Sequence, residues 1–185
     1  STDVSIIRNT NADAIIAVYP FTPQPVITSA VMQAAEVPVF VGVGGGLTQG
    51  MRVVNLGRHA EYQGAMGVVV NAPTGNDVIR LLAAEVDIPI VVTVVTREDD
   101  IGARLEAGAQ ILNVSAAKAT PDIVREIRKK YPDVPIIATG GPSESSVKAT
   151  VDAGANAITW TPPSNGEVFA DIMEAYRRNE KHPDF

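Results

Sequence analysis

Residues 133–167 read DVPIIATGGPSESSVKATVDAGANAITWTPPSNGE, and this stretch decides the fold. An apolar run at 134–139 leads into Gly140-Gly141, a segment of helix length follows, and a second apolar run occupies 156–161. Parallel strands need a crossover of a dozen or more residues, usually a helix, and a strand buried on both faces is almost continuously apolar. The stretch therefore predicts a strand, a helix and a second strand parallel to the first.

The same alternation extends back almost to the first residue of the sequence. Apolar runs rich in β-branched residues predict strands at 13–19, 37–43, 66–71, 88–96, 110–115, 134–139 and 156–161. Segments with helical periodicity lie between them, and a further helix is predicted at 3–11. Unbroken alternation of strand and helix is typical of an α/β fold with an all-parallel sheet.

Start and stop signals support the predicted helices. Thr120 precedes Pro121, Ser143 precedes a helical segment, and Ser164 with Glu167 fits a capping box. Small tripeptides with a central glycine end three other helices, at 63–65, 107–109 and 153–155. These signals place the helix boundaries independently of the apolar runs.

Regular spacing without a long insertion favours a (β/α)8 TIM barrel over an open doubly wound sheet, which is the alternative. A closed barrel of this class needs eight strands, whereas the sequence offers seven. We therefore expect residues 1–185 to form a single barrel domain that is incomplete at its amino terminus, with the first strand missing from this sequence.

The amino-acid composition excludes some classes of binding partner for this protein. The chain of 185 residues is 45% hydrophobic, carries a net charge of −6 and has no cysteine. Acidic and basic residues are interleaved, so no basic stripe is available for nucleic acid. No apolar run is long enough for a membrane span, and no signal peptide is recognisable. We expect a cytoplasmic protein that binds neither nucleic acid nor membrane and carries no cofactor.

A glycine cluster at 42–46 follows a predicted strand and precedes a helix, as a dinucleotide-binding loop would. Its spacing does not match GxGxxG, and the next strand ends in Asn71 with no acidic residue to hold a ribose. A close-packed or flexible loop at the mouth of the barrel is the favoured interpretation.

The pattern IIATGGPS, helix, DAGANAITW resembles the last two βα units of the phosphate-binding aldolase-type TIM barrels. This group includes ketodeoxyphosphogluconate aldolases, thiamine phosphate synthases and N-acetylmannosamine-6-phosphate epimerases. The resemblance implies a phosphate site formed by Gly140, Gly141, Ser143 and Ser164, using backbone N–H groups and a helix N-terminus. Pro162 and Pro163 depart from the group's second phosphate loop because they remove two N–H donors.

Alternation along the strands predicts which side chains line the mouth. The predicted substrate-lining residues are almost all neutral, and they are Tyr19, Gly44, Asn71, Thr93, Asn113, Ser115, Thr139, Thr159 and Thr161. Such groups can orient a polar ligand, but proton transfer near neutral pH normally needs an ionisable group.

Ionisable residues beyond strand ends supply the catalytic candidates. Lys118 follows the strand that would be sixth in a full barrel, and its place is similar to that of the Schiff-base lysine of class I aldolases. In ketodeoxyphosphogluconate aldolases that lysine lies within the strand, where this chain has Asn113. Arg97 could clamp a carboxylate or phosphate, whereas Glu98 and Asp99 are expected to be first-turn helix acids. The strand ends lack the several acids that a metal site would need.

Two hypotheses follow for the function. The first is an aldolase-type enzyme with lyase or isomerase chemistry on a small anionic metabolite, with Lys118 as base or Schiff-base former and Arg97 as anion clamp. The second is a non-catalytic barrel that binds a metabolite and has a regulatory or assembly role. Association into a homo-oligomer is compatible with either hypothesis.

Overall fold

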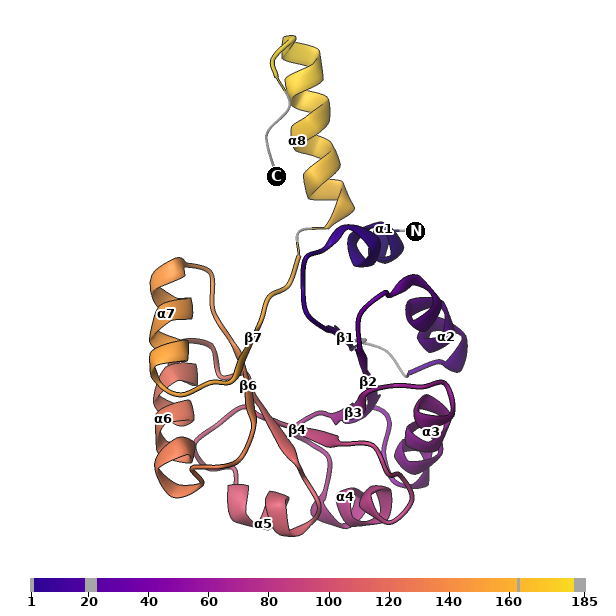
Figure 1. Ribbon diagram of the computed structural model, residues 1–185, viewed down its shortest axis with the longest axis vertical. Helices are drawn as coiled ribbons and strands as arrows, with labels where there is room; N and C mark the ends of the chain where they lie inside the picture. Colours follow the sequence, from indigo (N-terminus) through magenta and orange to yellow (C-terminus); the bar gives the residue numbers. More distant parts are fainter. Residues whose placement is uncertain (1, 19–22, 163, 182–185) are drawn as a thin grey trace.

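A computed structural model describes residues 2–18, 23–162 and 164–181 (Figure 1). Its strands are β1 (Ile15–Ala17), β2 (Val39–Gly44), β3 (Gly67–Val70), β4 (Ile90–Val94), β5 (Ile111–Val114), β6 (Ile136–Thr139) and β7 (Ala157–Thr159). Its helices are α1 (Thr2–Asn9), α2 (Pro25–Ala34), α3 (Met51–Tyr62), α4 (Asn76–Ala83), α5 (Ile101–Glu106), η1 (Ala117–Ala119, a 3₁₀ turn), α6 (Thr120–Lys130), α7 (Glu144–Asp152) and α8 (Asn165–Arg178). Each predicted strand is confirmed, with shorter bounds.

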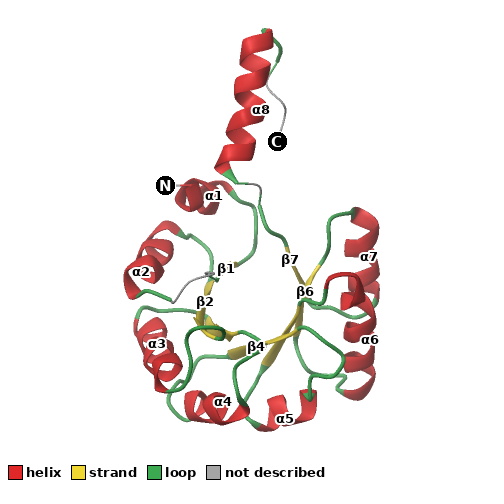
Figure 2. Cartoon of the chain, turned by 180° about the vertical axis from the view of Figure 1, so that it is seen from behind, coloured by secondary structure: helices red, strands yellow, loops and turns green. Residues whose placement is uncertain are grey.

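The strands form one seven-stranded sheet in sequential order, and each strand pairs in parallel with the next. The sheet curves, with helices α1 to α7 around its outside, and it stays open between the edge strands β1 and β7 (Figures 1 and 2). The predicted α/β barrel class is therefore confirmed, in the form of an open, seven-stranded barrel.

The main core lies between the sheet and the helices around it. On β5, Leu112 and Val114 are fully buried and pack in one cluster with Ile123, Val124 and Ile127 of α6. A second cluster joins alternate residues of the first four strands to α2, α3 and α4. Because alternate residues of a strand point to opposite faces, the residues between them lie on the concave face of the sheet.

Helix starts follow the sequence signals in part. Ser143 caps α7 by accepting a hydrogen bond from the Ser146 N–H, and Ser164 and Glu167 form the predicted capping box of α8. The prediction that Thr120 caps α6 is wrong, because Ala119 is the capping residue. Thr120 lies inside the helix, where its hydroxyl accepts a hydrogen bond from the Ala116 N–H at 3.0 Å.

Helix ends follow the glycine signals. Gly64, Gly108 and Gly154 all have positive φ, between 86° and 114°. After each glycine, the N–H of the next residue returns to a carbonyl in the last turn, as from Ala109 to Arg104 at 3.1 Å. This pattern is the Schellman motif, in which glycine tolerates the left-handed conformation that the turn needs.

The last helix behaves differently from the others. Helix α8 extends away from the sheet instead of packing on its outer face, and both views agree on this (Figures 1 and 2). It leaves β7 at the same edge of the barrel where the sheet is open.

Candidate functional site

Five of the predicted mouth residues lie in a row on the concave face of β4 to β7, and they form two separate hydrogen-bonded groups. The hydroxyl row comprises Thr93, Asn113, Ser115, Thr139 and Thr159. Asn113 Nδ2 donates to Thr93 Oγ1 at 3.3 Å, Thr139 donates to Ser115 Oγ at 3.2 Å, and Thr159 donates to Thr139 at 3.4 Å. Strand register explains the contacts, because Thr93 pairs with Asn113 and Thr139 pairs with Thr159.

The row leaves one acceptor without a partner. Asn113 Oδ1 is buried and makes no hydrogen bond within the described part of the chain. Each member of the row is uncharged, so the row can orient hydroxyl or carbonyl groups of a ligand but cannot supply a charge.

Other predicted lining residues lie elsewhere. A β-bulge between Gly42 and Gly44 shifts the alternation of β2. A Cβ added at Gly44 would lie 2.6 Å from Cγ2 of Val53 on α3, so this position faces the helix. Gly44 therefore does not line the mouth, contrary to the prediction. Gly45 has φ of 103°, and a Cβ there would lie 2.3 Å from the Cβ of Asn71. Close packing accounts for this part of the glycine cluster, as the favoured interpretation had it.

Tyr19 and Pro163 lie outside the described residues. Thr161 lies with Trp160 at the opening of the sheet. There, Ile6 and Ile7 of α1, Ile16 of β1 and Val18 beyond it, Trp160 and Thr161 line a cavity of about 460 Å³, which we call the edge slot. The side chain of Trp160 is 68% exposed.

Lys118 lies in η1, directly beyond β5, and its side chain is exposed. It follows Ala117, whose φ of 49° is left-handed and strained for a residue with a Cβ. The Ala119 N–H donates to the Ala116 carbonyl at 3.0 Å, which closes the turn. Within the described residues, Lys118 forms no ion pair or side-chain hydrogen bond.

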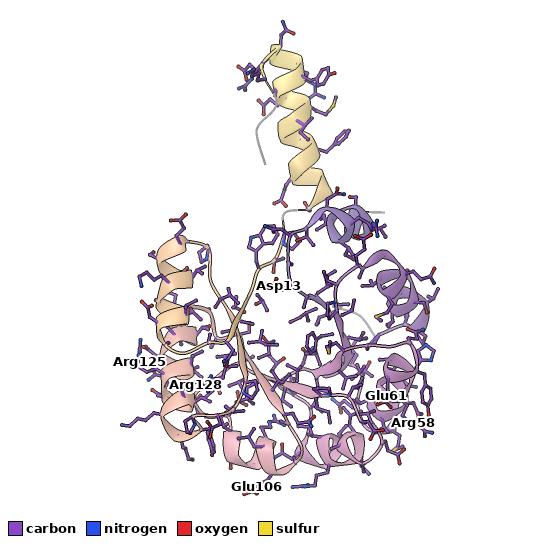
Figure 3. The ribbon with its side chains drawn as sticks, in the orientation of Figure 1. Asp13, Arg58, Glu61, Glu106, Arg125 and Arg128 are labelled. Atoms are coloured by element: carbon purple, nitrogen blue, oxygen red, sulfur yellow. The ribbon has the colours of Figure 1, made fainter. Side chains whose placement is uncertain are left out.

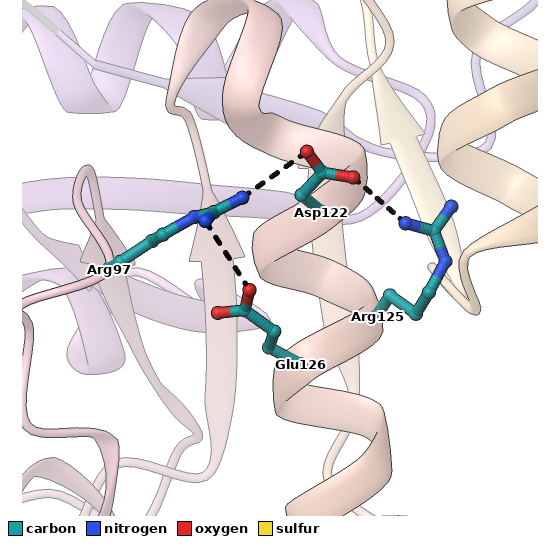
Figure 4. A network of polar contacts seen from close by, with 4 residues as sticks. All are labelled: Arg97, Asp122, Arg125 and Glu126. Atoms are coloured by element: carbon teal, nitrogen blue, oxygen red, sulfur yellow. Dashed lines mark hydrogen bonds and ion pairs between the residues drawn. The ribbon is translucent and has the colours of Figure 1, made fainter.

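Arg97 belongs to a different network (Figure 4). Its guanidinium lies 3.2 Å from Asp122 and 3.6 Å from Glu126, both on α6, and Asp122 also binds Arg125 at 2.9 Å. Two carboxylates therefore compete with any anionic ligand for Arg97. The sequence could not reveal this, because Asp122 is 25 residues further along the chain.

Acidic residues near Arg97 accept hydrogen bonds from backbone N–H groups close to them in the sequence. Asp99 Oδ2 accepts hydrogen bonds from the N–H groups of Val95 and Thr96 at 3.0 and 3.1 Å. Asp100, and neither Glu98 nor Asp99, caps α5, and it accepts from the Ala103 N–H at 3.0 Å. The prediction of Glu98 and Asp99 as first-turn acids is wrong, because the helix begins only at Ile101.

Groups proposed for phosphate have partners of their own. Ser143 Oγ contacts the hydroxyls of Ser145 and Ser146 at 3.0 and 3.1 Å while it caps α7. The Gly140 N–H lies 3.5 Å from the Thr159 carbonyl, and Gly141 has φ of 80°. Of these residues, Gly141 keeps a backbone N–H for which no acceptor is found in the described residues.

Ser164 is occupied by a carboxylate. Its N–H and its hydroxyl both donate to Glu167 Oε2, at 2.8 and 2.7 Å. These hydrogen bonds, first from the hydroxyl and then from the backbone, lower the pKa of Glu167 below its ordinary value. A negative charge thus already lies at this helix N-terminus, which disfavours a phosphate at Ser164.

Two kinds of site are absent from the residues that the structure describes. No group of three or more histidine or acidic side chains there is arranged to hold a metal ion. None of the helices in the described ranges is both long and apolar enough to cross a bilayer.

Two features of the site could not be predicted from the sequence. The left-handed Ala117 gives no sequence signal, because alanine carries no preference for positive φ. The edge slot arises from the opening between strands that are far apart in the sequence, so only the folded chain shows it.

Comparisons with known proteins place the fold. No protein-family model matches the chain, and no curated protein matches it. Among solved structures, dihydrodipicolinate synthase from Aquifex aeolicus has a TM-score of 0.65 and 19% identity, over 96% of this chain and 68% of the synthase. N-acetylneuraminate lyase from Mycoplasma synoviae has a TM-score of 0.66 and 14% identity, over 95% of this chain and 67% of the lyase.

A mandelate oxidase structure also matches, with a TM-score of 0.68 and 16% identity, over 85% of this chain and 57% of the oxidase. The chain thus spans between 57% and 68% of the length of these three proteins. At such identities the likeness establishes the fold alone. The chain has the fold of the (β/α) barrels, and the chemistry has to be argued from its own residues.

Proposed function

We propose that this barrel performs aldolase-type lyase chemistry on a small 2-keto acid, with Lys118 as the amine that forms a Schiff base. The observation that carries the proposal is the unpaired amine of Lys118 on a strained turn at the carboxyl end of β5. Backbone strain of this kind concentrates at functional sites, and barrel enzymes place their chemistry at the carboxyl ends of strands.

Elimination among the described loops supports the choice of Lys118. Beyond the strand ends, the ionisable side chains are those of residues 97–100 and Lys118. Arg97 is held by two carboxylates, while Asp99 and Asp100 are held by backbone N–H groups. Glu98 is exposed, and its carboxylate cannot form a Schiff base. Two of the proteins with a similar fold, a synthase and a lyase, are compatible with this chemistry.

The proposed reaction uses the iminium that Lys118 forms with the substrate as an electron sink. The Lys118 nitrogen attacks the keto carbon of the substrate, water leaves, and an iminium forms. The 4-hydroxyl of the substrate then gives its proton to water and the C3–C4 bond breaks, which releases an aldehyde. The electron pair of that bond moves into the iminium to give an enamine. Protonation and hydrolysis then return the amine and a shorter keto acid.

The hydroxyl row would orient the hydroxyl and carbonyl oxygens of the substrate. For its acidic group we favour a carboxylate over a phosphate, because Ser143 caps α7 and Ser164 holds Glu167. The Gly141 N–H is the backbone donor proposed for this carboxylate.

An activity assay tests the proposal. A panel of 4-hydroxy-2-keto acids is incubated with the protein, and release of the shorter keto acid is measured. We expect turnover by the wild type and a fall to background in Lys118→Arg, which keeps the charge but cannot form the Schiff base. Lys148→Arg is the matched control, since Lys148 is paired with Asp152 at 2.7 Å on α7. Full activity in Lys118→Arg, or no turnover by the wild type across the panel, would contradict the proposal.

A further inference from the structure

Ser115 lies at the end of a chain of hydroxyl groups on the concave face of the sheet. Thr159 donates to Thr139 at 3.4 Å, and Thr139 donates to Ser115 at 3.2 Å, so the hydrogen bonds of this group all run in one direction. A hydroxyl carries one proton and accepts through its lone pairs. Ser115 therefore accepts from Thr139, and within the described ranges its own proton has no acceptor.

The chain of hydroxyls makes Ser115 a better donor than an isolated serine. A hydroxyl that accepts a hydrogen bond becomes more polarised, and hydrogen bonds in a row strengthen one another. Because one proton already lies between Thr139 and Ser115, the Ser115 proton has to point elsewhere. The Ser115 side chain is exposed, so a ligand at the mouth can accept this proton in a hydrogen bond.

Backbone contacts fix Ser115 and Lys118 on one short segment. The Ser115 N–H donates to the Val94 carbonyl at 2.9 Å, which continues the pairing with β4 beyond the end of β5. The Ala116 N–H donates to Thr120 Oγ1 at 3.0 Å, which ties the segment to α6. Ser115 and Lys118 are three residues apart on this segment, at the carboxyl end of β5.

The other members of the hydroxyl row are less suited to donate to a ligand. The protons of Thr139 and Thr159 lie in hydrogen bonds within the row. Asn113 Nδ2 donates to Thr93, and Thr93 is itself buried. The remaining donor nearby, the Gly141 N–H, is the one proposed for the substrate carboxylate. Ser115 is thus the hydroxyl left for the reacting carbonyl.

We propose that the Ser115 hydroxyl donates a hydrogen bond to the keto oxygen of the substrate while Lys118 attacks the keto carbon. This role rests on the proposed function, and it supplies the group that stabilises the charge on the oxygen. As the lone pair of the neutral amine forms the carbon–nitrogen bond, the π electron pair of the carbonyl moves onto the oxygen. A donor held at this oxygen lowers the barrier, because the charge there is larger in the transition state than in the substrate.

The protons of this step balance without a transfer from Ser115. The oxygen first takes up the proton that the attacking nitrogen releases, passed through water, and a carbinolamine forms. A second proton from the solvent allows the oxygen to leave as water and gives the iminium. Ser115 keeps its own proton throughout, so it donates a hydrogen bond and not a proton.

Rapid trapping of the imine measures the step in which Ser115 is proposed to act. Protein and pyruvate are mixed, borohydride is added after increasing delays, and the adduct on Lys118 is quantified by mass spectrometry at several pyruvate concentrations. We expect Ser115→Ala to lower the limiting rate of adduct formation by roughly 10- to 100-fold, with little change in the half-saturating pyruvate concentration. Ser115→Thr retains a hydroxyl and should restore most of the rate.

Two further variants separate this role from a structural one. Thr139→Val removes the hydroxyl that donates to Ser115, and it should lower the rate less than Ser115→Ala does. Ser29→Ala is the matched control, because the Ser29 hydroxyl lies on α2 and donates to the Pro25 carbonyl at 3.0 Å, and its loss should leave the rate unchanged. Circular dichroism should be the same for all variants.

The outcomes distinguish this role of Ser115 from the proposed function itself. A wild type that is trapped on Lys118, together with an undiminished rate in Ser115→Ala, would overturn the role of Ser115 alone. A loss in Ser115→Ala that Ser115→Thr does not restore would also overturn it. A wild type that forms no adduct on Lys118 would overturn the proposed function as well.

Discussion

Arg128, which is labelled in Figure 3, lies on α6 and joins three parts of the chain through hydrogen bonds. Its guanidinium donates to the Gly154 carbonyl through Nε and Nη2 at 3.2 and 2.9 Å, and to Asn156 Oδ1 at 2.8 Å. It also donates to the Val134 carbonyl at 2.8 Å. These bonds tie the end of α7 and the start of β7 to α6 at the face opposite the proposed site.

Replacing Arg128 should therefore destabilise the fold without touching the site. We expect Arg128→Met, which keeps the apolar stem, to lower the free energy of unfolding by about 2 kcal/mol, because several partly buried acceptors lose their donor. Chemical denaturation measures this effect. Arg125→Met is the control, since Arg125 is exposed and pairs only with Asp122 among the described residues, and it should change stability by roughly 0.5 kcal/mol or less. Equal losses in the two variants would contradict this account of Arg128.

Single residues differ in how far the sequence reveals their roles. Gly64, Gly108 and Gly154 could be placed at helix ends because the need for positive φ is local. Arg97 could not be placed, because its partners lie on α6, distant in sequence, and come close to it only in the folded chain.

At the scale of elements, the start of α8 depends on one titrating group. The hydrogen bonds from Ser164 stabilise the carboxylate form of Glu167 and lower its pKa in the folded state. A lowered folded pKa means that the stabilisation is present above the carboxyl's ordinary pKa, and it is lost as the pH falls through the lowered value.

We expect α8 to fray from its first turn on acidification below about pH 4, near the ordinary pKa of glutamate. The amide shift of Ser164, followed by NMR against pH, should report this titration. In Glu167→Gln the side chain can still accept from Ser164, so the helix should form but its first turn should no longer respond to pH. An unchanged pH response in this variant would show that another group controls the start of α8.

The strands, too, could be predicted where their features depend on local sequence, but not where they depend on distant parts of the chain. All seven were predicted because a parallel buried strand is a continuous apolar run. The hydroxyl row also followed from alternation, since Thr93, Asn113, Ser115, Thr139 and Thr159 occupy alternate positions near strand ends. Gly44 was misplaced because a bulge resets the alternation, and nothing in the local sequence marks that bulge.

At the scale of the whole molecule, the sequential order of parallel strands brings every strand-to-helix loop to one end of the barrel. This arrangement places the turn that carries Lys118 at the same end as the hydroxyl row and Gly141. The alternation of strands and helices predicted that order directly. The opening between β1 and β7 and the outward course of α8 are visible only in the folded chain.

Trapping of the proposed Schiff base tests the central claim most directly. The protein is incubated with pyruvate and sodium borohydride, and the modified residue is located by peptide mass mapping. We predict a single stable adduct on Lys118 that is retained in Lys148→Arg and absent from Lys118→Arg. No adduct with pyruvate or other small 2-keto acids, or equal labelling of several exposed lysines, would contradict the claim that Lys118 is the catalytic amine.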